Sequence, residues 1–378
     1  MLQIDGKYGS AKVFTKDVEQ SAYQQIAELM NQPFVKDAHV RIMPDVHAGM
    51  GCVIGTTMRI VDKVCPNLVG VDVGCGVLVM NLPLTRDSFD AKAFDQLVRR
   101  IPAGFQVNQQ PLYQEEQVQM LEELKCFDQI NNIQRIYRSL GTLGGGNHFI
   151  EVAVNQEDQL YLLIHSGSRN LGTQIAKHYQ NLAIAYHGAG KKKPSALPKA
   201  LAYLEGAQLK DYLHDMRIAQ RWAAWNREVM AQRIASSCTP PMDLSDARVF
   251  QTIHNYIDDK GILRKGAVAA HEGEMLVIPL NMRDGSIIAR GLGNPDWNHS
   301  APHGAGRLMS RGEARRSIDL KDFQRSMAGI YSSTLNKSTL DEAPMAYKDK
   351  EDILAAILDT VEVLDIIKPV YNYKSAGD

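Results

Sequence analysis

The residue types best suited to chemistry lie in short glycine-rich segments. Residues 69–76 read VGVDVGCG, which places Asp72 and Cys75 three residues apart after an apolar run. Glycine lets the backbone turn sharply, so the carboxylate and the thiolate can face one metal ion. A buried aspartate and a small apolar cysteine at a turn explain the same pair without a ligand. The segment is therefore a candidate metal site only in combination with further ligands.

A second glycine run, GTLGGGNHFIE, extends over residues 141–151. Its exposed backbone N–H groups suit a phosphate, but the run is neither a Walker A loop nor a Rossmann fingerprint. If the stretch is helical, Asn147 and Glu151 share a face, and a carboxylate is a natural acceptor for the N–H donors of a guanine edge. A tight turn followed by a strand explains the run equally well.

Histidines follow or end several apolar segments. His165 ends the run YLLIH and precedes a small-residue turn and a predicted helix, His254 follows the apolar residues 249–253, and His47 lies in MPDVHAGMG. The carboxyl end of a strand is where α/β proteins place functional groups. The default explanation for each residue alone is still a core histidine satisfied by hydrogen bonds.

His303 lies in SAPHGAGR, with four arginines close behind it: Arg307, Arg311, Arg315 and Arg316. An imidazole can act as a nucleophile while arginines and backbone amides hold phosphate oxygens. A solvated basic helix is the simpler explanation for the three arginines after Arg307. Together, the thiol, carboxylate, imidazoles and anion-binding loops favour a thiolate-bridged metal pair beside a nucleotide phosphate. Ligands of this kind accept Mn²⁺, Zn²⁺, Co²⁺ or Fe²⁺, so spacing does not name the ion.

The composition excludes several classes of protein. The 378 residues are 44% hydrophobic and 22% charged, which is typical of a folded globular chain and not of a disordered one. The 42 basic and 43 acidic residues exclude a basic coat for nucleic acid. The five cysteines lack any C-x-x-C spacing, which disfavours disulfides and a structural zinc knuckle. No signal peptide or membrane-spanning run is visible, so we expect a cytoplasmic protein without a membrane partner.

Periodicity predicts a mixture of helices and strands around these segments. We expect buried strands at residues 38–42, 52–55 and 68–71. We expect helices near residues 17–31, 115–140, 172–186, 204–233 and 351–367. The basic, proline-bearing stretch 191–198 predicts a loop or insertion around residues 190–200 and not a boundary. The simplest organisation is one catalytic domain over residues 1–378.

Taken together, the segments resemble the RtcB-type RNA ligases. The resemblance extends from MPDVH at residues 43–47 to YNYK at residues 371–374, and it includes GVDVGCG, GGGNHFIE, HSGSRN, RKGA at residues 264–267 and HGAGR in that order. It covers most of the chain with highly specific motifs. It implies an α+β fold, namely a single large mixed-sheet catalytic domain with a central metal- and nucleotide-binding cleft.

The resemblance also implies a GTP- and Mn²⁺-dependent reaction. His303 would attack the α-phosphorus of GTP and carry GMP, and the Lys-x-Asp-Gly nucleophile of other ligases is missing here. The implied ligands of two Mn²⁺ ions, with the thiolate bridging them, are Asp72, Cys75, His148, His165 and His254. The implied guanylate contacts are Asn147, Glu151, Ser286, the backbone of His303, Gly304, Ala305 and Gly306, and the side chains of Tyr347 and Lys374.

The implied substrates are RNA ends, in RNA repair or tRNA splicing. A 2′,3′-cyclic phosphate would be opened to a 3′-phosphate, GMP would move to that phosphate, and a 5′-hydroxyl would displace it. Attack requires an unprotonated imidazole, so the covalent step should weaken on the acid side of neutrality. The basic residues 191–193 together with Arg311, Arg315 and Arg316 would contact RNA through phosphate charge. An activating or repair partner protein is compatible with this scheme.

The chain departs from the family pattern at one loop. Family members usually read PGSMG where residues 279–285 read PLNMRDG, just before Ser286. This divergence and the short chain favour a repair-type bacterial paralogue. A metal-dependent phosphodiesterase or phosphatase acting on RNA cyclic phosphates would want similar ligands without a covalent nucleotide. A binding protein that had lost catalysis would lack ligands, whereas every ligand position is filled here.

Overall fold

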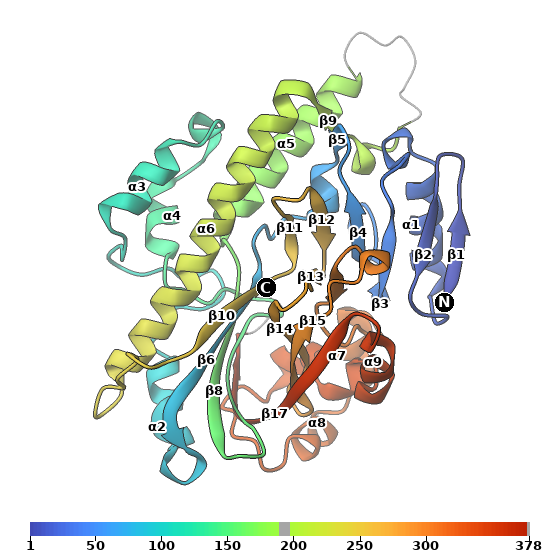
Figure 1. The fold of residues 1–378 in the computed structure, drawn as a ribbon. Coiled ribbons are helices and arrows are strands. Elements are labelled where there is room, and N and C mark those ends of the chain that lie inside the picture. The colour runs from blue at the N-terminus through green and yellow to red at the C-terminus, as the bar shows by residue number, and fades with distance from the viewer. Residues whose placement is uncertain (189–196, 376–378) are drawn as a thin grey trace.

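Two large sheets carry the residues of interest (Figure 1). The computed structural model describes residues 1–188 and 197–375. The first sheet has six strands in the order β1 (Leu2–Asp5), β2 (Ser10–Val13), β3 (Arg41–His47), β4 (Ile54–Arg59), β12 (Ile262–Lys265) and β11 (Asn255–Ile257). The second has seven in the order β10 (Val249–Ile253), β6 (Gly76–Thr85), β8 (Gln159–Ser166), β7 (Phe149–Val154), β17 (Val361–Lys374), β15 (Gly285–Gly291) and β14 (Met275–Asn281).

Two short pairs complete the strands. They are β13 (Ala267–Ala269) with β16 (Ser300–Pro302), and β5 (Lys63–Val64) with β9 (Leu204–Glu205). All strand pairs of the second sheet are antiparallel, whereas β2 and β3 of the first sheet run parallel. Antiparallel neighbours place the start of one strand beside the end of the next, and this places residues that are distant in sequence at one edge.

The seven-stranded sheet is buried on both faces. On one face, Leu78 and Leu162 lie in a core cluster with Met230 and Ile234. On the other face, side chains of β6, β8 and β7 meet those of β15, β14 and β17 in a second cluster: Val77, Val79, Phe149, Ala153, Leu163, Val277, Ile288 and Ile367. The sheet therefore curls until its two ends face each other, and the site described below lies at one edge of this near-barrel.

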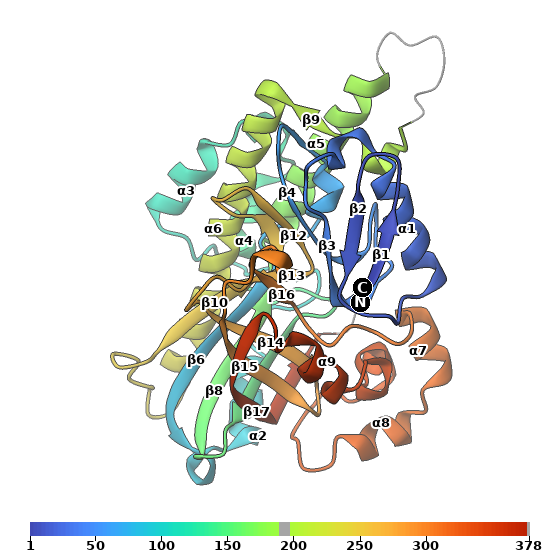
Figure 2. The same ribbon diagram turned by 45° about the vertical axis from the view of Figure 1, so that its right-hand side comes forward.

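The helices surround the two sheets (Figures 1 and 2). They are α1 (Gln20–Met30), α2 (Ala91–Val98), α3 (Glu115–Glu122), α4 (Ile133–Ser139), α5 (Asn170–Gly188), α6 (Gly206–Ser237), α7 (Arg311–Ser317), α8 (Leu320–Ser326) and α9 (Lys350–Ile357). The long helix α6 lies beside α5 and packs on β6 and β8, while α7, α8 and α9 gather around the C-terminal part of the chain (Figure 1). The mixed α and β fold class is confirmed, and the single-domain organisation stays a prediction.

Several expected elements differ in detail from those observed. The strands expected at 38–42 and 52–55 begin later, at Arg41 and Ile54, and the helix expected over 115–140 is broken into α3 and α4. The strand expected at 68–71 is wrong, because these residues form the end of a 3₁₀ turn and a loop in which Gly70 has a φ of +98°. A short buried apolar run does not by itself distinguish a strand from a buried turn.

The helix expected over 351–367 is correct only for its first half. Helix α9 ends at Ile357, and Val361 begins the longest strand of the sheet. The β-branched residues Val361, Val363, Ile366 and Ile367 favour an extended backbone, and tertiary pairing decides the outcome. The basic residues 191–193 lie outside the described residues. Within the described part of the chain, no helix is long and apolar enough to cross a membrane. All five cysteines are free thiols.

Candidate active site

Four candidate metal ligands, one cysteine and three histidines, meet at one edge of the seven-stranded sheet. Cys75 directly precedes β6, His148 directly precedes β7, His165 lies near the end of β8, and His254 directly follows β10. The pairs that set this register are Gly76 with Ser166, Gly76 with Ile253, and Phe149 with His165. Antiparallel pairing therefore brings strand starts and strand ends together, which explains why ligands up to 179 residues apart in sequence become neighbours.

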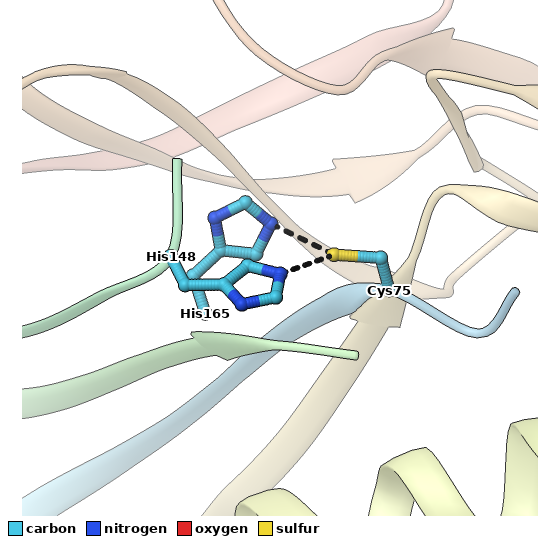
Figure 3. A group of neighbouring side chains, drawn as sticks. All are labelled: Cys75, His148 and His165. Carbon is cyan, nitrogen blue, oxygen red and sulfur yellow. Dashed lines mark hydrogen bonds between the residues drawn. The ribbon is translucent and has the colours of Figure 1, made fainter. Parts of the chain in front are cut away.

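Figure 3 shows the side chains of Cys75, His148 and His165 pointing at one another. Cys75 Sγ lies 3.4 Å from His148 Nε2 and 3.2 Å from His165 Nε2. His165 Nε2 lies 3.4 Å from His254 Nε2, and Asp72 Oδ2 lies 3.0 Å from His148 Nε2. Within residues 1–188 and 197–375, Cys75, His148 and His165 are the one group of three possible ligand atoms within 4.8 Å of one another.

Backbone carbonyls fix the orientation and the tautomer of two of the imidazoles. The Nδ1–H of His148 donates to Leu143 O at 2.9 Å, and the Nδ1–H of His165 donates to Asn147 O at 3.1 Å. A carbonyl oxygen only accepts, so the Nε2 lone pair of each ring is left for the cluster. Burial lowers the pKa of His165 and of His254 well below the usual value, which keeps both rings neutral. Neutral imidazoles with a thiol and a carboxylate are a donor set that fits a divalent transition metal.

The pKa values of the carboxylate and of the thiol of this cluster shift in opposite directions. Burial raises the pKa of Asp72, but its contacts with His148 and Cys75 outweigh the effect of burial, so the net pKa lies below the usual value. Burial, followed by the neighbouring Asp72 carboxylate, raises the pKa of the Cys75 thiol well above its usual value. A metal ion that binds the thiolate must therefore displace a proton. Gly167 allows the close approach of Asp72, since a Cβ there would lie 2.0 Å from Asp72 Oδ1.

A cavity of about 170 Å³ opens beside the metal-ligand cluster. It is lined by His165 and His254 of the cluster, and by all the residues expected to contact guanylate: Asn147, Glu151, Ser286, His303, Gly304, Ala305, Gly306, Tyr347 and Lys374. The remaining expected ligands, Asp72, Cys75 and His148, lie directly behind this lining. The structure thus brings every predicted site residue to one place.

A buried carboxylate, Glu342, organises one wall of the cavity. Its Oε2 accepts from Lys374 Nζ at 2.5 Å and from the Tyr347 hydroxyl at 2.8 Å, and its Oε1 lies 3.5 Å from both Arg307 and Arg311. Burial raises the pKa of Glu342, but these cations outweigh it, so the net pKa is lowered. Glu342 was not among the predicted residues, because it belongs to no recognisable sequence motif.

Glu151 lines the same cavity, but its hydrogen bonding and the shift of its pKa differ from those of Glu342. Its Oε2 accepts from Asn372 Nδ2 at 2.7 Å, and its Oε1 has no hydrogen-bond partner although it is buried. Burial raises the pKa of Glu151 to about 7, offset in part by Asn372 and Lys374. The carboxyl group therefore holds an unused acceptor that faces a ligand site.

His303 lies where the two sheets meet. Its Nδ1–H donates to Asp45 Oδ2 at 2.7 Å, and its backbone N–H donates to the same oxygen at 3.2 Å. Asp45 belongs to β3 of the first sheet, and Gly306 permits this contact because a Cβ there would lie 2.6 Å from Asp45 O. The His303 ring lies 5.0 Å from that of His254, measured between centroids. Asp45 holds the Nδ1 proton, so the Nε2 lone pair is available to react.

Asp45 is a candidate site residue that the sequence analysis did not single out. The signal was present, because Asp45 lies in the MPDVH segment that also supplies His47. His47 lines the cavity too, and burial lowers its pKa. The helical interpretation of residues 147–151 is wrong, since Asn147 lies in a turn and Glu151 in β7, yet both line the cavity.

The arginines after His303 have different roles. Arg307 and Arg311 line the cavity, and both approach Glu342. Arg315 instead lies 3.3 Å from the buried Asp341, whereas Arg316 is exposed on α7. The divergent loop 279–285 contributes Pro279 to Met282 and Gly285 to the lining, and Asn281 caps this turn through its bonds to Asp284.

Comparison with known proteins gives one consistent result. The family model described as "tRNA-splicing ligase RtcB" matches residues 25–132 and 115–375. The chain is 32% identical to the RNA-splicing ligase RtcB of Escherichia coli K12, over 96% of this chain and 97% of that protein. It is 28% identical to an RNA-splicing ligase RtcB2 of another Escherichia coli strain, over 95% and 93% of the two chains. It is also 28% identical to the tRNA-splicing ligase RtcB of Aeropyrum pernix, over 82% of each.

Proposed function

The chain belongs to the tRNA-splicing ligase RtcB family and is an RNA ligase, and we propose that it joins RNA ends with GTP through a guanylate carried on His303. The upstream RNA would end in a 2′,3′-cyclic phosphate or a 3′-phosphate, and the downstream RNA would begin with a 5′-hydroxyl. The observation that carries the proposal is the position of His303. His303 lines one cavity together with the residues expected to contact guanylate, and its ring lies beside that of the expected metal ligand His254.

The nucleophile is prepared by its own surroundings. The Asp45 carboxylate accepts from His303 Nδ1, which orients the ring and stabilises the imidazolium character that develops as Nε2 attacks. In the first step, Nε2 bonds to the α-phosphorus of GTP, the bond to the bridging oxygen breaks, and pyrophosphate leaves. Arg307 and Arg311 lie where they can neutralise the phosphate oxygens.

Guanine recognition is assigned to Glu151 and to other polar residues of the cavity lining. The unpaired Oε1 of Glu151 can accept an N–H of the guanine Watson–Crick edge, a bond that adenine cannot match in the same way. Asn147, Ser286, Tyr347 and Lys374 line the same space and supply further polar contacts. Backbone amides of the segment 303–306 suit the phosphate side of the nucleotide.

The metal-ligand cluster fits two Mn²⁺ ions held by Asp72, Cys75, His148, His165 and His254. Bound there, such ions would neutralise phosphate charge and hold the triphosphate in line for attack. The chain's own part is to keep the imidazoles neutral with their Nε2 atoms turned inward, as the carbonyl partners of His148 and His165 do.

The later steps transfer GMP and then release it. An oxygen of the RNA 3′-phosphate bonds to the phosphorus of His303-GMP, the N–P bond breaks, and the neutral imidazole is restored. The 5′-hydroxyl of the second RNA then attacks the activated 3′-phosphorus, loses its proton, and GMP leaves. Activation is needed because an unmodified phosphate oxygen is a poor leaving group.

RNA joining tests this proposal. Purified protein is incubated with Mn²⁺, GTP and two RNA strands, one ending in a 2′,3′-cyclic phosphate and the other beginning with a 5′-hydroxyl. We expect a joined product with GTP and none when ATP replaces it. Opening of the cyclic phosphate without joining, and without any need for GTP, would instead establish the metal-dependent phosphodiesterase alternative.

Further parts of the proposal concern context. We propose that the enzyme acts in the cytoplasm, in RNA repair or tRNA splicing, as a repair-type bacterial paralogue. An activating partner protein is compatible with this role, and omission of any partner from the joining assay shows whether turnover needs one. Repeating the assay with RNA ends from a cleaved tRNA and from a nicked ribosomal RNA compares the two settings.

A further inference from the structure

Two adjacent residues of helix α6, Asn226 and Arg227, lie fully buried behind the metal-ligand cluster. Both are 0% exposed, and α6 buries one further charged residue, Asp215. Burial of a guanidinium and an amide at neighbouring positions is costly unless their donors and acceptors are used. Their partners are therefore informative, and all of them lie in the segments that carry the metal ligands.

Arg227 joins three of these segments. Its Nη1 donates to Gly74 O at 3.0 Å and to Ser166 O at 2.7 Å, and its Nε donates to Gln251 Oε1 at 2.7 Å. Gly74 directly precedes Cys75, Ser166 directly follows His165, and Gln251 lies three residues before His254. One guanidinium thus fixes the backbone on either side of the thiolate and imidazole donors.

Asn226 adds the fourth segment. Its Oδ1 accepts from the backbone N–H groups of Gly141 and Thr142 at 2.8 and 3.0 Å, at the start of the loop that carries His148. Its Nδ2 donates to Thr142 O at 3.0 Å, to Ser166 Oγ at 3.0 Å and to Gly167 O at 3.2 Å. Ser166 Oγ donates in turn to Leu143 O at 2.7 Å, the same carbonyl that fixes His148.

We propose that Asn226 and Arg227 are positioning residues that hold the metal ligands together before metal binds. The proposal rests on the metal cluster of the proposed function. Sheet pairing places the four segments side by side. Without the contacts of Asn226 and Arg227, the ion itself would have to fix the exact positions of the donor atoms, and the free energy of that ordering would be lost from metal affinity. The planar guanidinium suits the task because its donors reach several acceptors at once in a fixed geometry.

The chemistry of the cluster agrees with a positioning role. No carboxylate forms an ion pair with Arg227 among the described residues, and its Nη2 has no hydrogen-bond partner. A guanidinium kept there only for stability would more simply be replaced by an apolar side chain. Its bonds instead go to carbonyls beside metal ligands, where a shift of a few tenths of an ångström alters coordination.

Cobalt binding tests the proposal directly. The metal-free full-length protein is titrated with Co²⁺, which gives a sulfur-to-cobalt charge-transfer band when the Cys75 thiolate binds, together with d–d bands that report the geometry. We expect Arg227→Lys to bind Co²⁺ about 10- to 100-fold more weakly, with altered d–d bands. Gln251→Ala removes one of the three acceptors that bond Arg227, so it should lower the Co²⁺ affinity by a smaller factor.

A matched control separates positioning from general stability. Asp215 lies on the same helix, is equally buried, and accepts hydrogen bonds from the backbone N–H groups of Lys125 and Cys126, which belong to none of the metal-ligand segments. Asp215→Asn should lower the melting temperature and leave the Co²⁺ affinity and spectrum unchanged. Folded Arg227→Lys with wild-type affinity and spectrum would overturn the proposal. If Arg227→Lys does not fold, unchanged Co²⁺ affinity of Gln251→Ala overturns it instead. Absence of the thiolate band in the wild type would refute the metal cluster itself.

Discussion

The cavity has a metal half, formed by the candidate metal ligands, and a guanylate half, formed by the residues expected to contact guanylate. The two halves differ in how their side chains are charged. In the metal half, the imidazoles of His165 and His254 are kept neutral, and the raised pKa of Cys75 keeps its thiol protonated until a metal binds. In the guanylate half, Glu342 is already ion-paired with Lys374 and bonded to Tyr347 without any ligand. The first half would gain positive charge from a bound ion, whereas the second half already pairs its charges within the protein.

The difference predicts what each kind of mutation damages. Substitutions in the metal half should remove activity and leave the metal-free fold almost as stable, because few buried charges depend on them. Substitutions in the guanylate half should destabilise the fold, because a buried charge is left without its partner. His303 lies between the two halves. Its ring is oriented by Asp45, which belongs to the six-stranded sheet.

The largest effect is expected from Asp45→Asn. An asparagine amide can donate to His303 Nδ1, which places the ring proton on Nε2 and blocks the nucleophile. We expect guanylylation to slow by about 10³- to 10⁴-fold while GTP binding is retained. Single-turnover labelling and calorimetric GTP titration measure the two effects. A matched loss of GTP affinity would show that Asp45 acts on the site as a whole and not on the ring.

Lys374→Met tests the guanylate half through stability. The substitution leaves Glu342 buried with weaker partners, so we expect the free energy of unfolding to fall by about 3 kcal/mol. Cys75→Ala in the metal-free protein serves as the contrasting change and should cost about 1 kcal/mol, because it removes one small uncharged group. Urea titrations of both variants give the comparison. Equal losses would show that the two halves are not built differently.

Glu151 gives GTP binding a pH dependence. Burial raises its pKa to about 7, and the carboxylate is a stronger acceptor for guanine than the neutral acid. GTP affinity should therefore fall as pH drops below about 7 and level off above it. Glu151→Gln should bind GTP about 10- to 100-fold more weakly at alkaline pH and show a flat profile. Calorimetry in a His303→Ala background avoids covalent capture. A wild-type affinity that does not change through neutrality would contradict this assignment.

The same group affects stability with a defined sign. Because burial raises the folded-state pKa of Glu151 above its usual value of 4.5, ionisation opposes folding. Stability from the neutral form is fully present below about 4.5 and is lost as pH rises through about 7. Glu151→Gln should therefore melt at a higher temperature than the wild type in alkaline buffer and at a similar temperature in acid.

The smallest effect is expected at the surface beyond the cavity. Arg316 is exposed, so Arg316→Gln should weaken RNA binding about two- to threefold and reduce the slope of its salt dependence by about one, with guanylylation unchanged. Arg311→Gln is the contrasting variant, since Arg311 lines the cavity beside Glu342 and should impair guanylylation. Loss of guanylylation in Arg316→Gln would extend the nucleotide site to the outer face of α7.

Sequence predicted the site better than it predicted the elements that hold it. Every predicted guanylate contact lines one cavity, and the predicted metal ligands line it or lie directly behind it, because each belongs to a motif whose residue types carry chemistry. Glu342 and Asp45 were missed, since a carboxylate acquires its role from a partner brought close only by tertiary packing. The first half of the strand at residues 361–374 was expected to be helical, because the strands with which it pairs are distant in sequence. The states of Glu151 and Cys75 depend on burial, which local spacing does not contain.

Covalent labelling with α-labelled GTP and Mn²⁺ tests the central claim most directly. We predict an acid-labile label on the wild-type protein, typical of a phosphorus–nitrogen bond, and none on His303→Ala. Cys75→Ala should be labelled at least about 100-fold more slowly, because the metal half would be incomplete. Label that survives His303→Ala, or an unlabelled wild type that is folded and metal-loaded, would contradict the account.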